Sequence, residues 1–167
     1  LEEVKSKLNS LQDNNFDKNV PKKVLILYAY YETDVSKNNL IFFLNNALIN
    51  NDNYYFCINI NGNSTLDFTD YTKKYNNLRI LYFDGKNSFQ AYLNIIDKTN
   101  IDDYENFIFL KDNIRGPYNL NKLESNWIDY FTNNLNKNID LIISAYGTSP
   151  LGKLYKIPYI TMKFMVL

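Results

Sequence analysis

The sequence predicts an α/β fold with a mainly parallel central sheet and helices on both faces. Short apolar runs of strand length recur along the 167 residues, and segments with apolar residues at helical spacing separate them. The first run is continuously apolar rather than alternating, which is typical of strands buried on both faces in parallel sheets. Alternation of this kind implies right-handed crossovers within a single sheet.

Length and composition fit one folded domain, residues 1–167. The chain is 46% hydrophobic with a formal net charge of zero, which indicates no general attraction to nucleic acid or to a membrane surface. It contains no run of transmembrane length, and its single cysteine excludes an internal disulfide framework. Because the first residue is Leu and the last residues resemble an uncapped strand, we expect a domain truncated at the C-terminus.

The N-terminal part of the chain predicts two strands and two helices. Apolar residues recur at helical spacing from Glu2 to Gln12, and the apolar run from Val24 to Tyr31 follows as a strand. Helical spacing returns from Ser36 to Leu48, and Tyr54 to Ile60 is the second strand. Polar turn signals end both strands, Glu32-Thr33-Asp34 and Asn61-Gly62-Asn63.

The middle of the chain continues the alternation. The segment from Asp67 to Tyr75 is ambiguous and is assigned a short helix, and Leu78 to Phe83 is the third strand. A helix through Ile96 follows, with Asn87 or Ser88 as its natural N-cap.

Three further strands and one helix complete the prediction. Asn106 to Leu110 is the fourth strand, and a helix around Ser125 to Leu135 comes next. Leu141 to Tyr146 and Tyr159 to Leu167 are the last two strands. The order of the strands in the sheet does not follow from the sequence.

Polar residues end several of these strands, and ligands of open α/β sheets bind at the carboxyl ends of strands. The expected residues along that edge are Tyr30, Tyr31, Asn61, Asp84 and Asp112. We expect at most one of the two tyrosines to be free of the core, where its ring could stack on a base or a sugar.

The sharpest boundary between a predicted strand and a polar loop lies in residues 107–118, which read FIFLKDNIRGPY. Its apolar run breaks within one residue into Lys111-Asp112-Asn113, followed by Arg115-Gly116-Pro117. A carboxylate flanked by Lys111 and Arg115 can hold a cation while the positive side chains meet phosphate oxygens. The alternative is that Asp112 and Asn113 only start a turn, since both residue types bond their own backbone.

Several enzyme classes are excluded. No glycine follows the first strand, so neither the dinucleotide fingerprint nor a P-loop is present, and without histidine no Ser-His-Asp or Cys-His set can form within this chain. What remains is carboxylate and amine chemistry, which suits a diphosphate with a hard cation. The candidate side chains are Glu32, Asp34, Asp84, Lys86, Lys111, Asp112 and Arg115.

Three blocks of the sequence, KVLILYAYYE, YFDGKNSFQAYL and FIFLKDNIRGPY, resemble the small GT-A type glycosyltransferases of large DNA viruses and bacteria that are related to rhamnan synthesis protein F. The resemblance covers roughly Lys23 to Tyr146. Its most specific block is the last one, where those proteins carry F-L-N-D-S-x-x-G-P at the end of a hydrophobic strand.

The resemblance implies transfer of a sugar from a nucleotide sugar, expected to be a UDP-sugar, to a glycan hydroxyl. It implies a divalent cation, Mn²⁺ or Mg²⁺, at Asp112, and a cytoplasmic protein, in the host cytoplasm if the source is a virus. It leaves the catalytic base unidentified. The expected nucleotide-sugar-binding residues are Tyr28, Ala29, Tyr30, Asp84, Lys86, Asn87, Lys111 and Arg115.

The sequence departs from the family pattern at three positions. Ser88 stands where an Asp is expected, Gln90 where a Gly is expected, and Lys111 where relatives carry Asn. Lys111 either binds the diphosphate directly or marks a site that has lost activity. The alternative function is therefore a degenerate, non-catalytic GT-A module that binds a glycan or a protein, and a third is an α/β ligand-binding domain unrelated to sugars.

Overall fold

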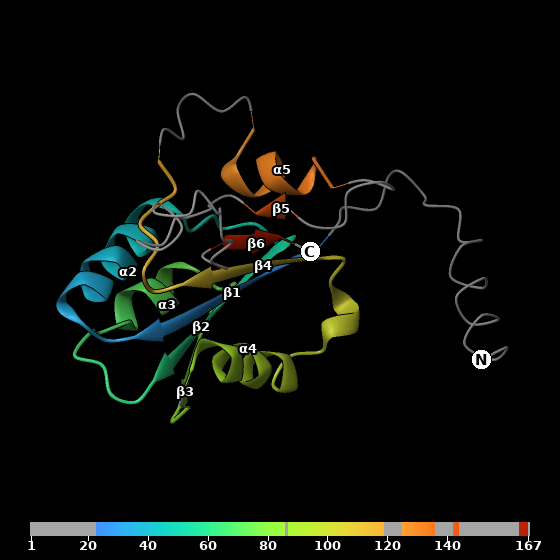
Figure 1. Cartoon of the computed structure of the whole chain (residues 1–167). Coiled ribbons are helices and arrows are strands. Elements are labelled where there is room, and N and C mark those ends of the chain that lie inside the picture. Colours follow the sequence, from blue (N-terminus) through green and yellow to red (C-terminus); the bar gives the residue numbers. More distant parts are fainter. Residues whose placement is uncertain (1–22, 86, 119–124, 136–141, 144–163, 167) are drawn as a thin grey trace, which may run out of the picture.

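The computed structural model describes residues 23–85, 87–118, 125–135, 142–143 and 164–166 (Figure 1). Several sequence predictions lie outside the described residues: the helix from Glu2 to Gln12, Lys86, and residues 141, 144–146, 159–163 and 167 of the last two strands. None of the helices in the described part of the chain combines the length and the apolar character that a membrane span requires.

The described strands form a six-stranded sheet in the order β3-β2-β1-β4-β6-β5. The first four are parallel, as predicted, and their spans agree with the sequence to within one residue at each end. They are β1 (Val24–Tyr31), β2 (Tyr54–Asn61), β3 (Leu78–Phe83) and β4 (Asn106–Lys111).

Two short strands extend the sheet beyond β4, and both pairings at this margin are antiparallel. Strand β6 (Phe164–Val166) pairs with β4, and β5 (Ile142–Ile143) pairs with β6. Strands were predicted in both places, although the antiparallel pairing of β6 with β4 and β5 could not be read from the sequence. The sheet is therefore mainly parallel with an antiparallel margin.

The helices cover both faces of the sheet (Figure 1). Their bounds are α2 (Asp34–Asn46), α3 (Thr69–Lys74), α4 (Ser88–Asp97) and α5 (Trp127–Thr132), with a 3₁₀ turn η1 (Ile101–Asp103) before β4. The ambiguous segment after β2 does contain a short helix, α3. Helices α2 and α5 pack on one face, and α4 packs on the other.

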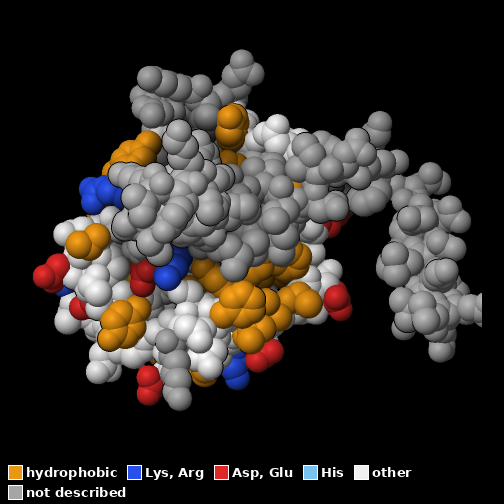
Figure 2. Space-filling view, viewed as in Figure 1, with side chains coloured by type: hydrophobic (Ala, Val, Ile, Leu, Met, Phe, Trp, Pro, Cys, Tyr) orange, Lys and Arg blue, Asp and Glu red, His pale blue; other side chains and the backbone are white. Residues whose placement is uncertain are grey.

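The continuous apolar run of β1 explains these two layers. Alternate residues of a strand point to opposite faces, so Ile26 and Tyr28 enter the larger core under α2 and α5, and Leu25 and Leu27 enter the smaller core under α4. In the space-filling view, hydrophobic side chains gather where α4 lies against the sheet (Figure 2). A strand in the middle of such a sandwich needs apolar residues at every position.

Polar caps fix where the helices start. Helix α2 begins after Thr33, which forms a capping box with Ser36, and α4 begins after Asn87, whose side chain accepts a hydrogen bond from the backbone N–H of Gln90 at 3.0 Å. Of the two N-caps considered for α4, the structure therefore has Asn87. Both helices start shortly after the carboxyl end of a strand, α2 after β1 and α4 after β3.

Candidate functional site

The carboxyl ends of β1 to β4 meet along one edge of the sheet, as predicted from the alternating pattern. The register pairs Ala29 with Lys111, Tyr31 with Asn61, and Asn61 with Phe83. Neighbouring strands lie about 4.8 Å apart, so this edge extends about 14 Å from β3 to β4. It carries polar residues where each strand enters its loop.

Asp112 lies directly after β4, between the ends of β1 and β4. Its Oδ2 accepts a hydrogen bond from the backbone N–H of Tyr31 at 3.1 Å, and its own backbone N–H donates to the carbonyl of Ala29 at 3.1 Å. The side chain of Asn39, buried on α2, donates to the Asp112 carbonyl at 3.1 Å. The two backbone contacts fix the position of Asp112, and the bond from Tyr31 orients its carboxylate.

Burial raises the pKa of the Asp112 carboxyl above its ordinary value. The backbone N–H of Tyr31, the charge of Lys111 and the backbone N–H of Asn113 oppose this rise. The charge of Asp112 in turn adds to the effect of burial in raising the pKa of two nearby phenols, Tyr28 and Tyr92. Asp112 is thus a desolvated carboxylate that its surroundings stabilise only in part.

The tyrosines of β1 differ in burial. As predicted, only one of Tyr30 and Tyr31 is free of the core. Tyr28 and Tyr30 are buried, whereas the side chain of Tyr31 is 60% exposed beside Asp112. Ala29 is buried between them. Contacts of Tyr28, Ala29 and Tyr30 with a nucleotide remain predictions, and Tyr31 presents the exposed ring at this edge.

Glu32, a candidate for carboxylate chemistry, ties two loops together. Its carboxylate accepts hydrogen bonds from the hydroxyls of Ser64 at 2.6 Å and Thr65 at 2.7 Å, from the backbone N–H of Thr65 at 2.9 Å and from the Tyr30 hydroxyl at 3.2 Å. Chiefly because of the bonds from Ser64 and Thr65, the pKa of Glu32 falls to about 2. Thr65 also accepts a bond from Lys37 Nζ at 2.7 Å.

A chain of amides lies at the end of β2 on the α4 face. Asn94 of α4 donates to Asn59 at 2.6 Å, and Asn59 donates to Asn61 at 3.2 Å. Asn59 and Asn61 are buried. Buried amides cost stability unless they are paired, so this network fixes α4 against the strand ends.

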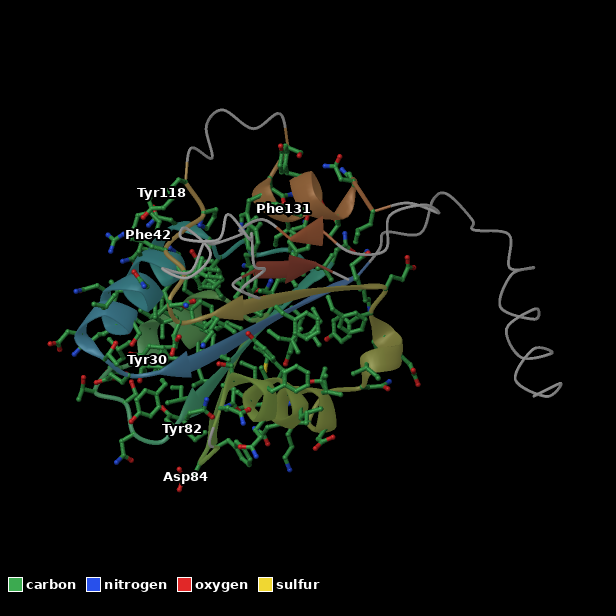
Figure 3. All side chains as sticks on the ribbon, in the orientation of Figure 1. Tyr30, Phe42, Tyr82, Asp84, Tyr118 and Phe131 are labelled. Atoms are coloured by element: carbon green, nitrogen blue, oxygen red, sulfur yellow. The ribbon has the colours of Figure 1, made fainter. Side chains whose placement is uncertain are left out.

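The remaining predicted residues lie at the two ends of the edge. Asp84 is exposed after β3 and points outward from the strand end (Figure 3), and Asn87 caps α4. Lys111 ends β4, and the guanidinium of Arg115 lies 4.7 Å above the ring of Phe42. The structure thus groups Lys111, Asp112 and the backbone of β1, while Asp84 and Asn87 lie on the far side of β2.

The chemistry of Asp112 fits a hard divalent cation, since carboxylate oxygens are preferred ligands of Mg²⁺ and Mn²⁺. Within the described residues, no group of three or more Asp, Glu, His or Cys side chains could hold a metal ion. Further ligands would therefore have to come from a bound diphosphate, from water or from other parts of the chain. Asp112 suits a cation held jointly with a ligand.

The fold is similar to that of a solved glycosyltransferase. A mannosyltransferase from Pyrobaculum calidifontis, solved in complex with GDP-Man and Mn²⁺, has a TM-score of 0.56 at 8% sequence identity, covering 96% of this chain and 50% of that chain. The apo structure of the bifunctional glycosyltransferase WbbM has a TM-score of 0.47 at 17% identity, covering 93% of this chain and 32% of that one. No protein-family model and no curated protein matches the sequence.

The likeness confirms the expected fold class, an α/β fold of the GT-A type. The chain spans about half the length of the mannosyltransferase structure. At this level of identity the likeness concerns the fold alone, so the chemistry of the site rests on the residues of this chain.

Sequence reasoning missed several residues at this edge. Asn39 and the Ser64–Thr65 pair gave no signal, because polar residues on helices and in loops are ordinary surface residues. The exposure of Tyr31 had a partial signal, since it is the last residue of the apolar run and precedes a polar loop. Asn61 was predicted at this edge, but its network gave no signal, because the packing of α4 against β2 brings Asn94 to Asn59.

Proposed function

We propose that this chain binds a nucleotide sugar, expected to be a UDP-sugar, and transfers the sugar to a hydroxyl of a glycan. The observation that carries the proposal is the Asp112 carboxylate, half-buried where β1 and β4 end and held by the N–H of Tyr31. The GT-A type of fold supports it, since the mannosyltransferase with this fold was solved with a nucleotide sugar and Mn²⁺.

Each residue at the edge has a proposed task. Tyr31 stacks on the base or on a sugar ring, because its ring is exposed beside the carboxylate. Asp112 holds a divalent cation together with the donor diphosphate, and Lys111 adds positive charge next to it. When bound, such a cation stabilises the charge that develops on the leaving diphosphate. The base that would deprotonate the acceptor hydroxyl is not assigned.

The raised pKa of Asp112 favours this task. Burial makes its negative charge costly, and a cation would relieve that cost. Carboxylates with perturbed pKa values cluster at functional sites. Glu32 offers the contrasting case, since its carboxylate is already bonded to three neighbouring residues.

A second candidate is a non-catalytic module with the same fold. Two observations favour it: Ser88 stands where the resembling proteins carry Asp, and the described residues contain no group of three or more Asp, Glu, His or Cys side chains that could hold a metal ion. Such a module would bind a glycan or a protein. Nucleotide-sugar binding separates the two candidates.

The test is a thermal-shift titration with UDP, UDP-glucose, UDP-galactose and GDP-mannose, each with and without Mn²⁺. A ligand present at 100 times its dissociation constant stabilises the folded state by about 2.7 kcal/mol. We expect a Mn²⁺-dependent rise in melting temperature with the UDP compounds, and its loss in Asp112→Asn.

The control is Asp52→Asn, which removes an exposed carboxylate from the turn before β2 and should keep the full shift. A shift that survives in Asp112→Asn would place the cation elsewhere. No shift with any nucleotide would favour the non-catalytic module, and a shift with GDP-mannose alone would correct the donor.

A further inference from the structure

A cavity of about 160 Å³ lies between the loop that follows β4 and the two helices above the sheet. Tyr28 and Leu110 contribute from the sheet, Phe43 from α2, and Trp127 and Phe131 from α5. The loop contributes residues 114–118. Figure 3 shows Tyr118 of this loop beside Phe42, with Phe131 on α5 across from them.

The described walls of this cavity are mostly aromatic and aliphatic. The indole N–H of Trp127 donates to the carbonyl of Ala47 at 2.9 Å, so it is already engaged. At the rim, the ring of Tyr118 lies 5.0 Å from that of Phe42, and the Arg115 guanidinium lies over the same ring. The cavity therefore offers apolar contacts from aromatic side chains and few polar groups.

The hydroxyl of one lining residue has no hydrogen-bond partner among the described residues. The side chain of Tyr28 is 2% exposed, and its buried hydroxyl is the unpaired group. A buried hydroxyl without a partner costs stability. The hydroxyls of other buried tyrosines differ, since Tyr30 donates to Glu32 and Tyr54 donates to Asp129.

We propose that this cavity binds a small molecule with a single, mainly apolar six-membered ring that carries one hydrogen-bond acceptor, to which the Tyr28 hydroxyl donates. An engineered apolar protein cavity of about 150 Å³ binds benzene, so the size fits one ring. The ligand satisfies the unpaired hydroxyl, and its ring packs against the aromatic walls.

The same walls disfavour a free sugar as the occupant. A sugar carries hydroxyls around its ring, and most of them would face Phe43, Leu110 and Trp127 without a partner. The pocket is therefore a second type of site, distinct in chemistry from the polar strand edge at Asp112. It requires neither a nucleotide nor a cation.

The test is an NMR titration of the ¹⁵N-labelled chain with three probes. Acetophenone has a ring and a carbonyl acceptor, toluene has the ring alone, and methyl β-D-glucopyranoside has a polar ring. We expect acetophenone to bind, with an affinity about tenfold lower for Tyr28→Phe. Toluene should bind wild type and Tyr28→Phe equally, and the glucoside should not bind in the cavity.

Two further variants complete the design. Tyr30→Phe removes a hydroxyl from the same strand that bonds Glu32 instead, so its acetophenone affinity should match wild type. Ile114→Phe fills the cavity from the loop and should abolish binding, with thermal melting as the check on folding. Binding that is absent up to the solubility limit, equal in Tyr28→Phe or retained in a folded Ile114→Phe would overturn the proposal.

Discussion

Glu32 and Asp112 are two carboxylates at the same edge of the sheet, but their surroundings differ. Glu32, after β1, accepts hydrogen bonds from Tyr30, Ser64 and Thr65, and its pKa is lowered to about 2. Asp112, after β4, is half-buried, and burial raises its pKa. The fold stabilises the first charge and destabilises the second.

This difference in surroundings indicates that Glu32 is a structural carboxylate and that Asp112 is available to a ligand. The bonds to Glu32 hold the loop after β2 against the end of β1, which shapes the edge. The bonds around Asp112 position its oxygens but leave the charge under-compensated. Functional residues often carry such a stability cost, and three variants test whether the two carboxylates divide in this way.

The largest stability change is expected for Glu32→Ala, which removes all the hydrogen bonds to this carboxylate. The hydroxyls of Ser64 and Thr65 lose their charged partner, and the loop after β2 loses its anchor. We expect a fall of several degrees in melting temperature at neutral pH, measured by circular dichroism. Asp52→Ala, at an exposed carboxylate, should leave the melting temperature nearly unchanged.

The pH dependence sharpens this prediction. The pKa of Glu32 is about 2 in the folded state against an ordinary value of 4.5, so the folded state binds its proton less tightly than the unfolded state. Its contribution to stability is complete above about pH 4.5 and is lost as pH falls toward about 2. The acid loss of stability should therefore be shallower in Glu32→Ala, and an unchanged acid profile would contradict the role of Glu32.

A smaller effect of opposite sign is expected for Asp112→Asn. Burial raises the folded-state pKa of this carboxyl, so its charge destabilises the fold at neutral pH, and the cost disappears as pH falls through the folded pKa. The amide oxygen of Asn can still accept the bond from the Tyr31 N–H. We expect a modest rise in melting temperature at pH 7 that vanishes in acid, whereas a loss of stability would make Asp112 a structural residue like Glu32.

The smallest effect is expected for Tyr30→Phe. The variant removes one hydrogen bond to Glu32, 3.2 Å long, and leaves the bonds from Ser64 and Thr65 in place. The expected loss is about 1 kcal/mol in the free energy of unfolding, measured by urea denaturation. In the Glu32→Ala background the same change should cost less, because the partner is gone; equal costs in both backgrounds would show that the two residues act independently.

The sequence carried enough information to predict the parallel strands and the position of Asp112 at the end of β4, while the binding of a cation by Asp112 stays a prediction. The run at β1 is apolar at every position because the strand is covered on both faces, and Asp112 stood out because an apolar strand ends abruptly beside it. The contacts of Glu32 with Ser64 and Thr65, and of Asn39 with Asp112, could not be predicted. They join distant segments, so they depend on strand order and loop shape, which local patterns do not encode.

The hydrogen bond from Tyr31 to Asp112 joins residues that are 81 positions apart in the chain. Contacts of high sequence separation form only after much of the chain entropy has been lost, and they slow folding. Strand β4 pairs directly with β1, although two strand-helix units intervene between them. The proposed donor site therefore forms only when β4, which is distant in the sequence, pairs with β1. An N-terminal fragment that stops before β4 would contain Tyr31 without its carboxylate partner.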